Sequence, residues 1–180
     1  MTPVEQLAIW VAQKHSGQLI KKTNEPYFNH LISVAEMAGK FTTWGYEIGL
    51  CHDLLEDTPT TKDDFFNALI SFNYDTDRAH YITDCVLELT DVFTSKAYPD
   101  TNKHSRKLQE TLRLCQISAA AQTVKYADLA YNIKWVLTHD PKHAKDYLER
   151  KRKLLLGMNK GNRELQREVL ALIDANSLAK

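Results

Sequence analysis

Residues 51–59 read Cys51-His52-Asp53-Leu54-Leu55-Glu56-Asp57-Thr58-Pro59, and they place one histidine and three carboxylates within six positions. If this stretch is helical, residues four apart share a face, so His52 lies under Glu56 and Asp53 lies under Asp57. Pro59 disfavours the helical conformation at Thr58 and ends the helix there. The sequence therefore predicts a cluster of four polar groups at the end of a helix.

Such a cluster needs a compensating positive charge. Acidic side chains at a helix C-terminus face the negative end of the macrodipole, at a cost of roughly 0.3–1 kcal/mol per exposed charge. A divalent cation would relieve this repulsion, because imidazole and carboxylate are both metal ligands. The alternative is a solvated acidic helix end. Further candidate ligands elsewhere in the chain would favour a metal site over a solvated helix end.

Composition limits the classes of protein to which the chain can belong. Its 180 residues are enough for one domain with a sizeable core, and 23 Lys and Arg balance 23 Asp and Glu. No overall field therefore attracts nucleic acid or an anionic membrane. No apolar run approaches the ~20 residues of a membrane span, and the N-terminus lacks the pattern of a signal peptide. We expect a cytoplasmic protein without nucleic-acid or membrane partners; homo-oligomers are possible but are not indicated.

The apolar periodicity predicts helices along the whole chain, with no strand alternation, repeat or dividing linker. Capping residues and prolines set most of their ends. The fold class is therefore all-α, a single domain over residues 1–180 with about eight to nine helices. The expected helices cover about 3–15, 30–38, 43–57, 61–69, 75–90, 103–116, 118–136, 141–157 and 163–175.

Two further residues are candidate ligands for the same cation. His30 follows Pro26-Tyr27 at the start of a predicted helix, and Asp128 lies among apolar neighbours, where an aspartate is rarely buried unless it is paired or bound to metal. In helical proteins, metal sites are built from inward-facing residues of several helices. Together with His52 and Asp53, the residues His30 and Asp128 supply two imidazoles and two carboxylates. This set suits manganese or iron, and zinc less clearly.

These residues carry a resemblance to a known family. The order His-x(21)-His-Asp…Asp is similar to that of the HD phosphohydrolase superfamily, and the chain more closely resembles the hydrolase domain of RelA/SpoT-type alarmone enzymes and the small standalone metazoan SpoT homologues. The resemblance covers about residues 5–155, with helices over 141–178 completing an HD-type bundle. The matching blocks are His15-Ser16-Gly17-Gln18, residues 25–30, residues 52–58, Leu89-Thr90-Asp91 and residues 124–132.

The resemblance implies an enzyme that hydrolyses the 3′-pyrophosphate of guanosine tetra- or pentaphosphate, the alarmones of the stringent response. It implies one Mn²⁺ per chain, with other divalent metals possible, held by His30, His52, Asp53 and Asp128. Glu56 and Asp57, one turn beyond the ligands, are the implied catalytic residues that orient water and move protons. No synthetase half is expected.

The expected contacts to the substrate are less specific. Asn132 matches a substrate-contacting asparagine of the family, and Lys21, Lys22 and Lys125 are candidates for phosphate groups, although lysines are more commonly solvated surface residues. Arg106 and Lys107 are also within possible reach of a phosphate, but a solvated helix face is the more common role of such a pair.

The nucleotide pocket departs from the family pattern more than the metal ligands do. Lys21 stands where the family commonly has an arginine that packs on the base, and Asn24 stands where it has a glycine. Two alternatives therefore remain open. One is hydrolysis of another phosphorylated nucleotide or dinucleotide, such as (p)ppApp or NADPH. The other is a non-catalytic regulator that binds the nucleotide.

Overall fold

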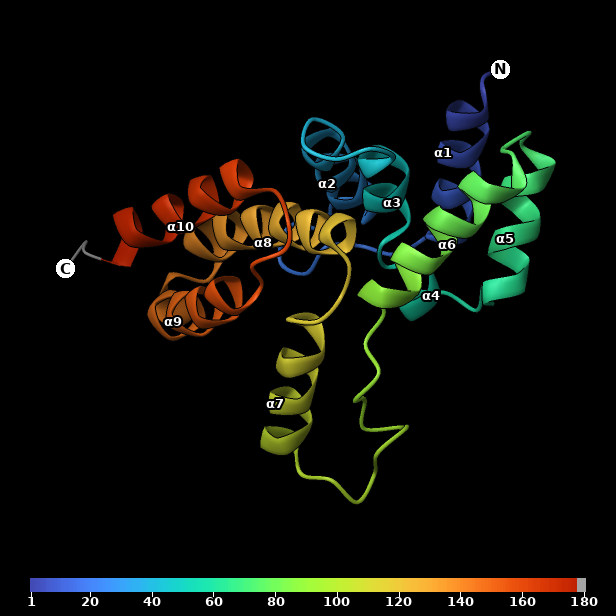
Figure 1. Cartoon of the computed structure of the whole chain (residues 1–180). Helices are drawn as coiled ribbons and strands as arrows, with labels where there is room; N and C mark the ends of the chain where they lie inside the picture. Colours follow the sequence, from blue (N-terminus) through green and yellow to red (C-terminus); the bar gives the residue numbers. More distant parts are fainter. Residues whose placement is uncertain (178–180) are drawn as a thin grey trace. The chain divides into compact units, whose positions relative to one another are not determined.

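The computed structural model describes residues 1–177 of the chain, which form ten helices joined by loops (Figure 1). The only pairing of extended chain within these residues is one isolated bridge between Leu19 and Pro26. The all-α prediction is confirmed. The chain divides into two compact units, Met1–Thr90 (unit 1) and Asp91–Lys180 (unit 2). The single domain over 1–180 stays a prediction. The predicted helices over 141–178 end at a position that lies outside the described residues.

Unit 1 contains six helices, most of which begin where the sequence predicts. Thr2 and Glu5 form the expected capping box of the first helix, and Thr61 forms another with Asp64. Helix α2 packs on α3, α3 and α4 pack on α6, and α5 joins α1 to α6. The helices are α1 (Pro3–Lys14), α2 (Phe28–Ala38), α3 (Gly45–Cys51), α4 (Leu54–Asp57), α5 (Lys62–Ser71) and α6 (Thr76–Leu89).

In the core of unit 1, helices α2 and α3 pack closely against each other. Leu31, Val34 and Ile48 are fully buried. A Cβ atom on Gly49 would lie only 2.9 Å from the Cα of Ala35, so α3 approaches α2 more closely there than an alanine would allow. This close packing places the ends of α2 and α3 side by side, which is where the candidate ligands lie.

The predicted continuous helix over 43–57 is wrong. The chain forms α3, leaves the helical path at His52-Asp53, where Asp53 has φ −102° and ψ 1°, and resumes as the single turn α4. The reason is local, because the His52 ring bonds the Gly49 carbonyl at 2.7 Å, an acceptor that a continuous helix would use for its own backbone. The expected stacking of His52 under Glu56 along one helix face is corrected accordingly.

Unit 2 contains four helices, of which the last three pack on one another. Gln122 ties the turn before α10 to α8, since its Oε1 accepts bonds from the Lys160 and Gly161 amides at 2.7 and 3.1 Å. Pro141 begins α9 as predicted, but Asp140 makes no side-chain cap and contacts His143 instead. The helices are α7 (Lys103–Leu114), α8 (Ala119–His139), α9 (Pro141–Gly157) and α10 (Arg163–Ser177).

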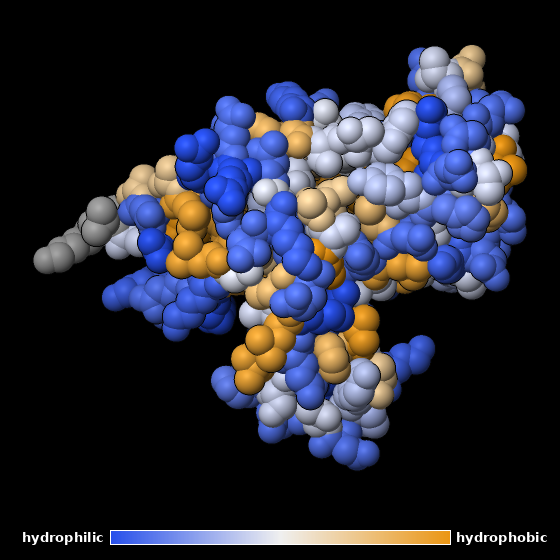
Figure 2. Space-filling view, in the orientation of Figure 1, coloured by the Kyte–Doolittle hydropathy of each residue, from blue (hydrophilic) through white to orange (hydrophobic). Residues whose placement is uncertain are grey.

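The loop over 92–102 is present as predicted and leads into α7. This helix is amphipathic, yet its apolar residues Leu108 and Leu112 are exposed, and Figure 2 shows hydrophobic atoms on its surface. Within residues 1–177, no helix combines the length and the apolar character that a membrane crossing requires.

Candidate metal centre

Three of the predicted ligands meet in unit 1. His30 comes from the first turn of α2, while His52 and Asp53 come from the break between α3 and α4. His30 Nε2 lies 3.3 Å from His52 Nε2 and 3.6 Å from Asp53 Oδ2, and His52 Nε2 lies 3.0 Å from the same carboxylate oxygen. Both imidazoles are buried. The break in the helix is thus what turns His52 and Asp53 toward His30.

The tautomer of His52 decides what these atoms can do. Its Nδ1 lies 2.7 Å from the Gly49 carbonyl oxygen, which can only accept, so Nδ1 carries the proton. In the neutral ring, Nε2 then presents a lone pair to the Asp53 carboxylate. A histidine that donates from its other nitrogen to a backbone carbonyl is the usual arrangement of a metal ligand.

The donor set fits a divalent cation. Each of the three residues offers one ligand atom, and these atoms lie within 4.8 Å of one another. Neighbouring ligands of a six-coordinate ion bound at about 2.1 Å are roughly 3 Å apart, close to the separations seen here. Lone pairs converging at such range repel one another unless a proton or a cation lies between them. The prediction of a metal-binding cluster in this part of the chain is confirmed for His30, His52 and Asp53.

Tyr27 is a functional partner that sequence reasoning missed. Its hydroxyl donates to Asp53 Oδ2 at 2.6 Å, and its ring stacks on His15 with centroids 5.7 Å apart. Burial by itself would raise the pKa of Asp53, but the adjacent His52 and His30 rings and the hydrogen bond from Tyr27 outweigh burial and hold that pKa well below its usual range. The signal in the sequence was Tyr27 itself, three residues before the first ligand.

The predicted catalytic residues Glu56 and Asp57 lie on α4, and both are exposed. Although Asp57 as a residue is exposed, its carboxyl group is partly shielded from water, and this burial, followed by the Asp53 carboxylate, raises its pKa against the opposing effects of His15 and Tyr27. The turn is held from the preceding loop, because Gln18 Nε2 donates to the Asp57 carbonyl at 2.7 Å and Gln18 Oε1 lies 2.8 Å from His15 Nδ1. His15 therefore supports the loop through its contact with Gln18.

The loop over 16–27 carries Lys21 and Lys22, and both side chains are exposed. Lys22 and Asn24 have positive φ values of 70° and 58°. Asparagine tolerates this left-handed conformation better than most residues, which explains why it can stand where the family has glycine. The predicted phosphate contacts of Lys21 and Lys22 remain predictions.

Asp128, the fourth predicted ligand, lies in unit 2 on α8 and is buried. Lys125 Nζ lies 2.8 Å from Asp128 Oδ2, and Asn132 Nδ2 donates to Asp128 Oδ1. Two residues expected to contact the substrate therefore hold Asp128 in place, one turn before it and one turn after it. The spacing of three and four residues could have indicated this. The joining of Asp128 to the other ligands stays a prediction.

The chain resembles known proteins in sequence and in fold. No protein-family model matches the chain. The chain is 27% identical over 183 residues to guanosine-3′,5′-bis(diphosphate) 3′-pyrophosphohydrolase MESH1 of Mus musculus, covering 96% of this chain and 94% of that protein. The human MESH1 protein matches with the same identity and the same coverage of both chains.

Two further matches extend the comparison. The chain is 26% identical over 133 residues to a GTP pyrophosphokinase of Myxococcus xanthus, which covers 73% of this chain but only 17% of that protein. A solved structure, described as a metazoan ortholog of SpoT that hydrolyzes ppGpp, matches with a TM-score of 0.80 at 20% identity over 99% of this chain and 97% of that one. The predicted resemblance to HD-type alarmone hydrolases, in sequence and in helical fold, is confirmed.

Proposed function

We propose that this chain, which resembles the HD-type alarmone hydrolases in sequence and fold, is a metal-dependent phosphohydrolase that removes the 3′-pyrophosphate from (p)ppGpp-type nucleotides. The observation that carries the proposal is the convergence of His30, His52 and Asp53, whose Nε2 and Oδ2 atoms lie 3.0–3.6 Å apart beside two exposed carboxylates of α4. The names of the similar proteins indicate the substrate.

The proposed ion is Mn²⁺, one per chain, with Asp128 as the fourth ligand on the strength of the family pattern. When bound, such an ion polarises a phosphoryl oxygen and lowers the pKa of a coordinated water. The residues of the chain would do the rest. Tyr27 would orient Asp53, and the Gly49 carbonyl would orient His52.

Glu56 and Asp57 would position the attacking water and move its proton. Both lie one turn beyond the ligands, and the raised pKa of Asp57 favours a group that can hold a proton near the reacting phosphate. Lys21 and Lys22 would approach the phosphates from the loop over 16–27. Lys125 and Asn132 would act mainly by holding Asp128, and any contact they make to the substrate is part of the same proposal. The chain would work in the cytoplasm.

The test is an assay of pyrophosphate release by the purified protein with Mn²⁺, supplied in turn with guanosine tetraphosphate, its adenosine analogue, NADPH and ordinary nucleotides. We expect turnover of the guanosine alarmone above all the others. Release from another nucleotide alone would keep the phosphohydrolase and replace its substrate. Binding without any turnover by the metal-loaded protein would make the chain a regulator.

The same assay separates the roles of ligand and catalyst. Glu56→Ala should lower kcat by roughly 10²- to 10⁴-fold while the metal content stays unchanged. Asp53→Ala should lose metal and activity together. Glu149→Ala, an exposed glutamate on α9, is the matched control and should retain both. Loss of metal in Glu56→Ala would contradict its assignment as a catalytic residue.

A further inference from the structure

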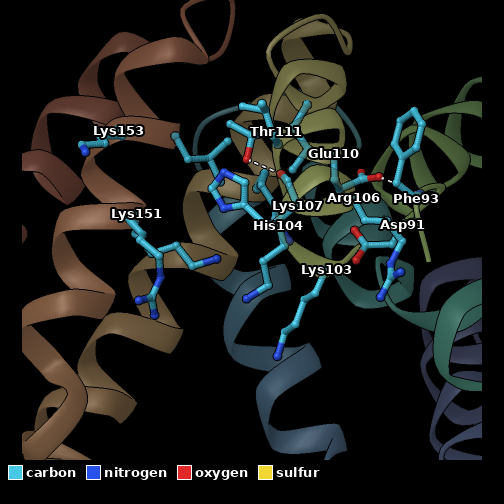
Figure 3. A pocket seen from close by; sticks show the side chains of 15 residues that line it. Asp91, Phe93, Lys103, His104, Arg106, Lys107, Glu110, Thr111, Lys151 and Lys153 are labelled. Atoms are coloured by element: carbon cyan, nitrogen blue, oxygen red, sulfur yellow. Dashed lines mark hydrogen bonds between the residues drawn. The ribbon is translucent and has the colours of Figure 1, made fainter. Parts of the chain in front are cut away.

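Unit 2 contains a cavity of about 740 Å³ whose walls come mainly from α7 and α9 (Figure 3). Seven of the 23 Lys and Arg residues of the chain line it, against two carboxylates, Asp91 and Glu110. The overall balance of charge therefore conceals a strongly cationic pocket. One wall carries Lys103, Arg106 and Lys107, and the other carries Arg150, Lys151 and Lys153.

One of the two carboxylates is already engaged. Glu110 Oε2 accepts bonds from the Val92 and Phe93 amides, both at 3.1 Å, and its Oε1 accepts from Arg113 Nε at 2.7 Å. Arg113 does not line the cavity. Glu110 thus fixes the start of the loop over 92–102 and is neutralised from outside, which leaves the lining cations in excess.

The cations of α7 are placed against the helix dipole. Lys103 is the first residue of α7, and its first turn contains no acidic residue. The N-terminus of a helix carries positive partial charge and favours anions, so Lys103, Arg106 and Lys107 add like charge at the end that least favours it. A bound anion would reverse the sign of this effect.

The opposite wall shows the same crowding. Lys151 is half-buried, and burial, followed by the charge of Lys125, lowers its pKa. Figure 3 shows Lys151 on α9 opposite the labelled residues of α7. Arg106 is partly engaged, because it donates to the Thr101 carbonyl, while Lys103, Lys107 and Arg150 are exposed.

We infer that this pocket, which we call the α7–α9 pocket, binds a small molecule that carries two or more linked phosphate groups. Its volume lies in the range of small-molecule sites, about 300–1,000 Å³. Lysine and arginine from two facing helices match the several oxygens of a polyphosphate chain. A nucleic-acid surface would instead be an open stripe of charge. The inference rests on unit 2 alone and does not depend on the proposed hydrolysis.

The experiment is isothermal titration calorimetry of the chelator-treated protein with sodium tripolyphosphate, pyrophosphate and orthophosphate at physiological salt. Chelation removes the metal centre as a competing anion site. We expect one tripolyphosphate per chain, weaker binding of pyrophosphate and the weakest of orthophosphate. The double variant Lys107→Gln with Arg150→Gln removes one cation from each wall and should weaken tripolyphosphate binding by roughly 100-fold, since each charge-assisted hydrogen bond contributes about a factor of ten.

The matched control is Lys142→Gln with Lys145→Gln, which removes the same charge from exposed positions of α9 that do not line the pocket. Its affinity should stay within about twofold, because distant exposed charges are screened. Equal weakening in the control, or binding that requires the metal, would overturn the inference. Tighter binding of a short single-stranded DNA than of tripolyphosphate would also overturn it, in favour of nucleic acid. Circular dichroism checks that both variants fold.

A kinetic arm identifies where the phosphates come from. If the α7–α9 pocket holds the phosphates of the substrate that are not cleaved, the Lys107/Arg150 variant raises KM for guanosine tetraphosphate and leaves kcat nearly unchanged. If the ligand is a separate molecule, KM stays unchanged while the affinity for tripolyphosphate still falls. Both results support a polyphosphate site, and neither depends on which nucleotide is hydrolysed.

Discussion

At the residue scale, the His52 ring is fixed by a single backbone contact. Its Nδ1 bonds the Gly49 carbonyl, which leaves Nε2 as a lone pair directed at Asp53 Oδ2, 3.0 Å away. Tyr27 donates to the same carboxylate oxygen. His52 and Asp53 are adjacent in the sequence, and each is oriented by a group outside the candidate ligand set. The Gly49 carbonyl orients His52, and the Tyr27 hydroxyl orients Asp53.

Tyr27→Phe tests this orientation. The variant keeps the ring that packs on His15 but removes the donor to Asp53, so metal affinity should fall by about tenfold, within the 10- to 100-fold range typical of such partners. Calorimetric titration with Mn²⁺ measures it. Tyr81→Phe, an exposed tyrosine on α6, serves as the control and should bind as tightly as the parent chain. Unchanged affinity in Tyr27→Phe would show that the hydroxyl has no part in holding the ligand.

At the scale of elements, the loop over 16–27 and the packing of α2 on α3 set the geometry of the site. The loop reaches α4 through Gln18, which bonds both His15 and the Asp57 carbonyl. Gly49 lets α3 approach α2, and so fixes the distance between His30 and His52. Gln18 and Gly49 are not candidate ligands themselves, yet they position the proposed catalytic residues and the candidate ligands.

Gln18→Ala should release α4 from the loop. We expect kcat for alarmone hydrolysis to fall by roughly 10- to 100-fold, because Glu56 and Asp57 lose their position. Metal affinity should change by less than about twofold, since Gln18 touches no ligand. Steady-state kinetics and metal titration on the same preparation measure the two effects, with Gln13→Ala, an exposed residue of α1, as the control. A parallel loss of metal would mean that the loop supports the ligands instead.

Gly49→Ala should push α3 away from α2. The added Cβ would lie 2.9 Å from the Cα of Ala35, and backbone cannot give way as a flexible side chain can. The overpacking cost exceeds the ~1 kcal/mol that alanine gains over glycine in a helix, which leaves a net loss of about 1–2 kcal/mol in the free energy of unfolding. Urea denaturation measures it, beside Asn67→Ala on the exposed face of α5. Stability at or above that of the parent chain would show that the two helices can separate at no cost.

At the scale of the whole molecule, each of the two units has its own buried core, and the predicted ligands are divided between them. His30, His52 and Asp53 belong to unit 1, and Asp128 belongs to unit 2. A cation that binds the folded chain stabilises it by mass action. Whether Asp128 contributes to that binding is therefore measurable as stability.

Addition of Mn²⁺ at about 100 times its Kd should raise the free energy of unfolding of the parent chain by about 2.7 kcal/mol. Asp128→Asn should abolish most of this increase. Asp146 is an exposed aspartate of α9, and the control variant Asp146→Asn should retain the full increase. Thermal or urea unfolding with and without the metal measures the difference. The full Mn²⁺ effect in Asp128→Asn would remove this residue from the ligand set and leave its role to its bonds with Lys125 and Asn132.

The sequence by itself determined most of the helices and supplied the candidate ligands. Apolar spacing and capping residues act locally, so Thr2, Thr61 and Pro141 begin their helices where they were expected to. The order of His30, His52, Asp53 and Asp128, together with the matching blocks around them, indicated the resemblance, which the comparisons confirm. The break at His52 did not follow from periodicity, because it depends on one ring bonding one carbonyl.

Only the tertiary structure decided which residues form hydrogen bonds with the residues of the site. Tyr27 meets Asp53 across 26 positions of sequence, and Gln18 meets Asp57 across 39. The α7–α9 pocket gathers cations from residues 103–153 that a balanced composition hides. Such contacts arise because folding brings distant side chains within hydrogen-bonding range. The residue types in the acidic cluster of residues 52–57 thus indicate the kind of site, whereas tertiary packing decides which residues hold each side chain in place.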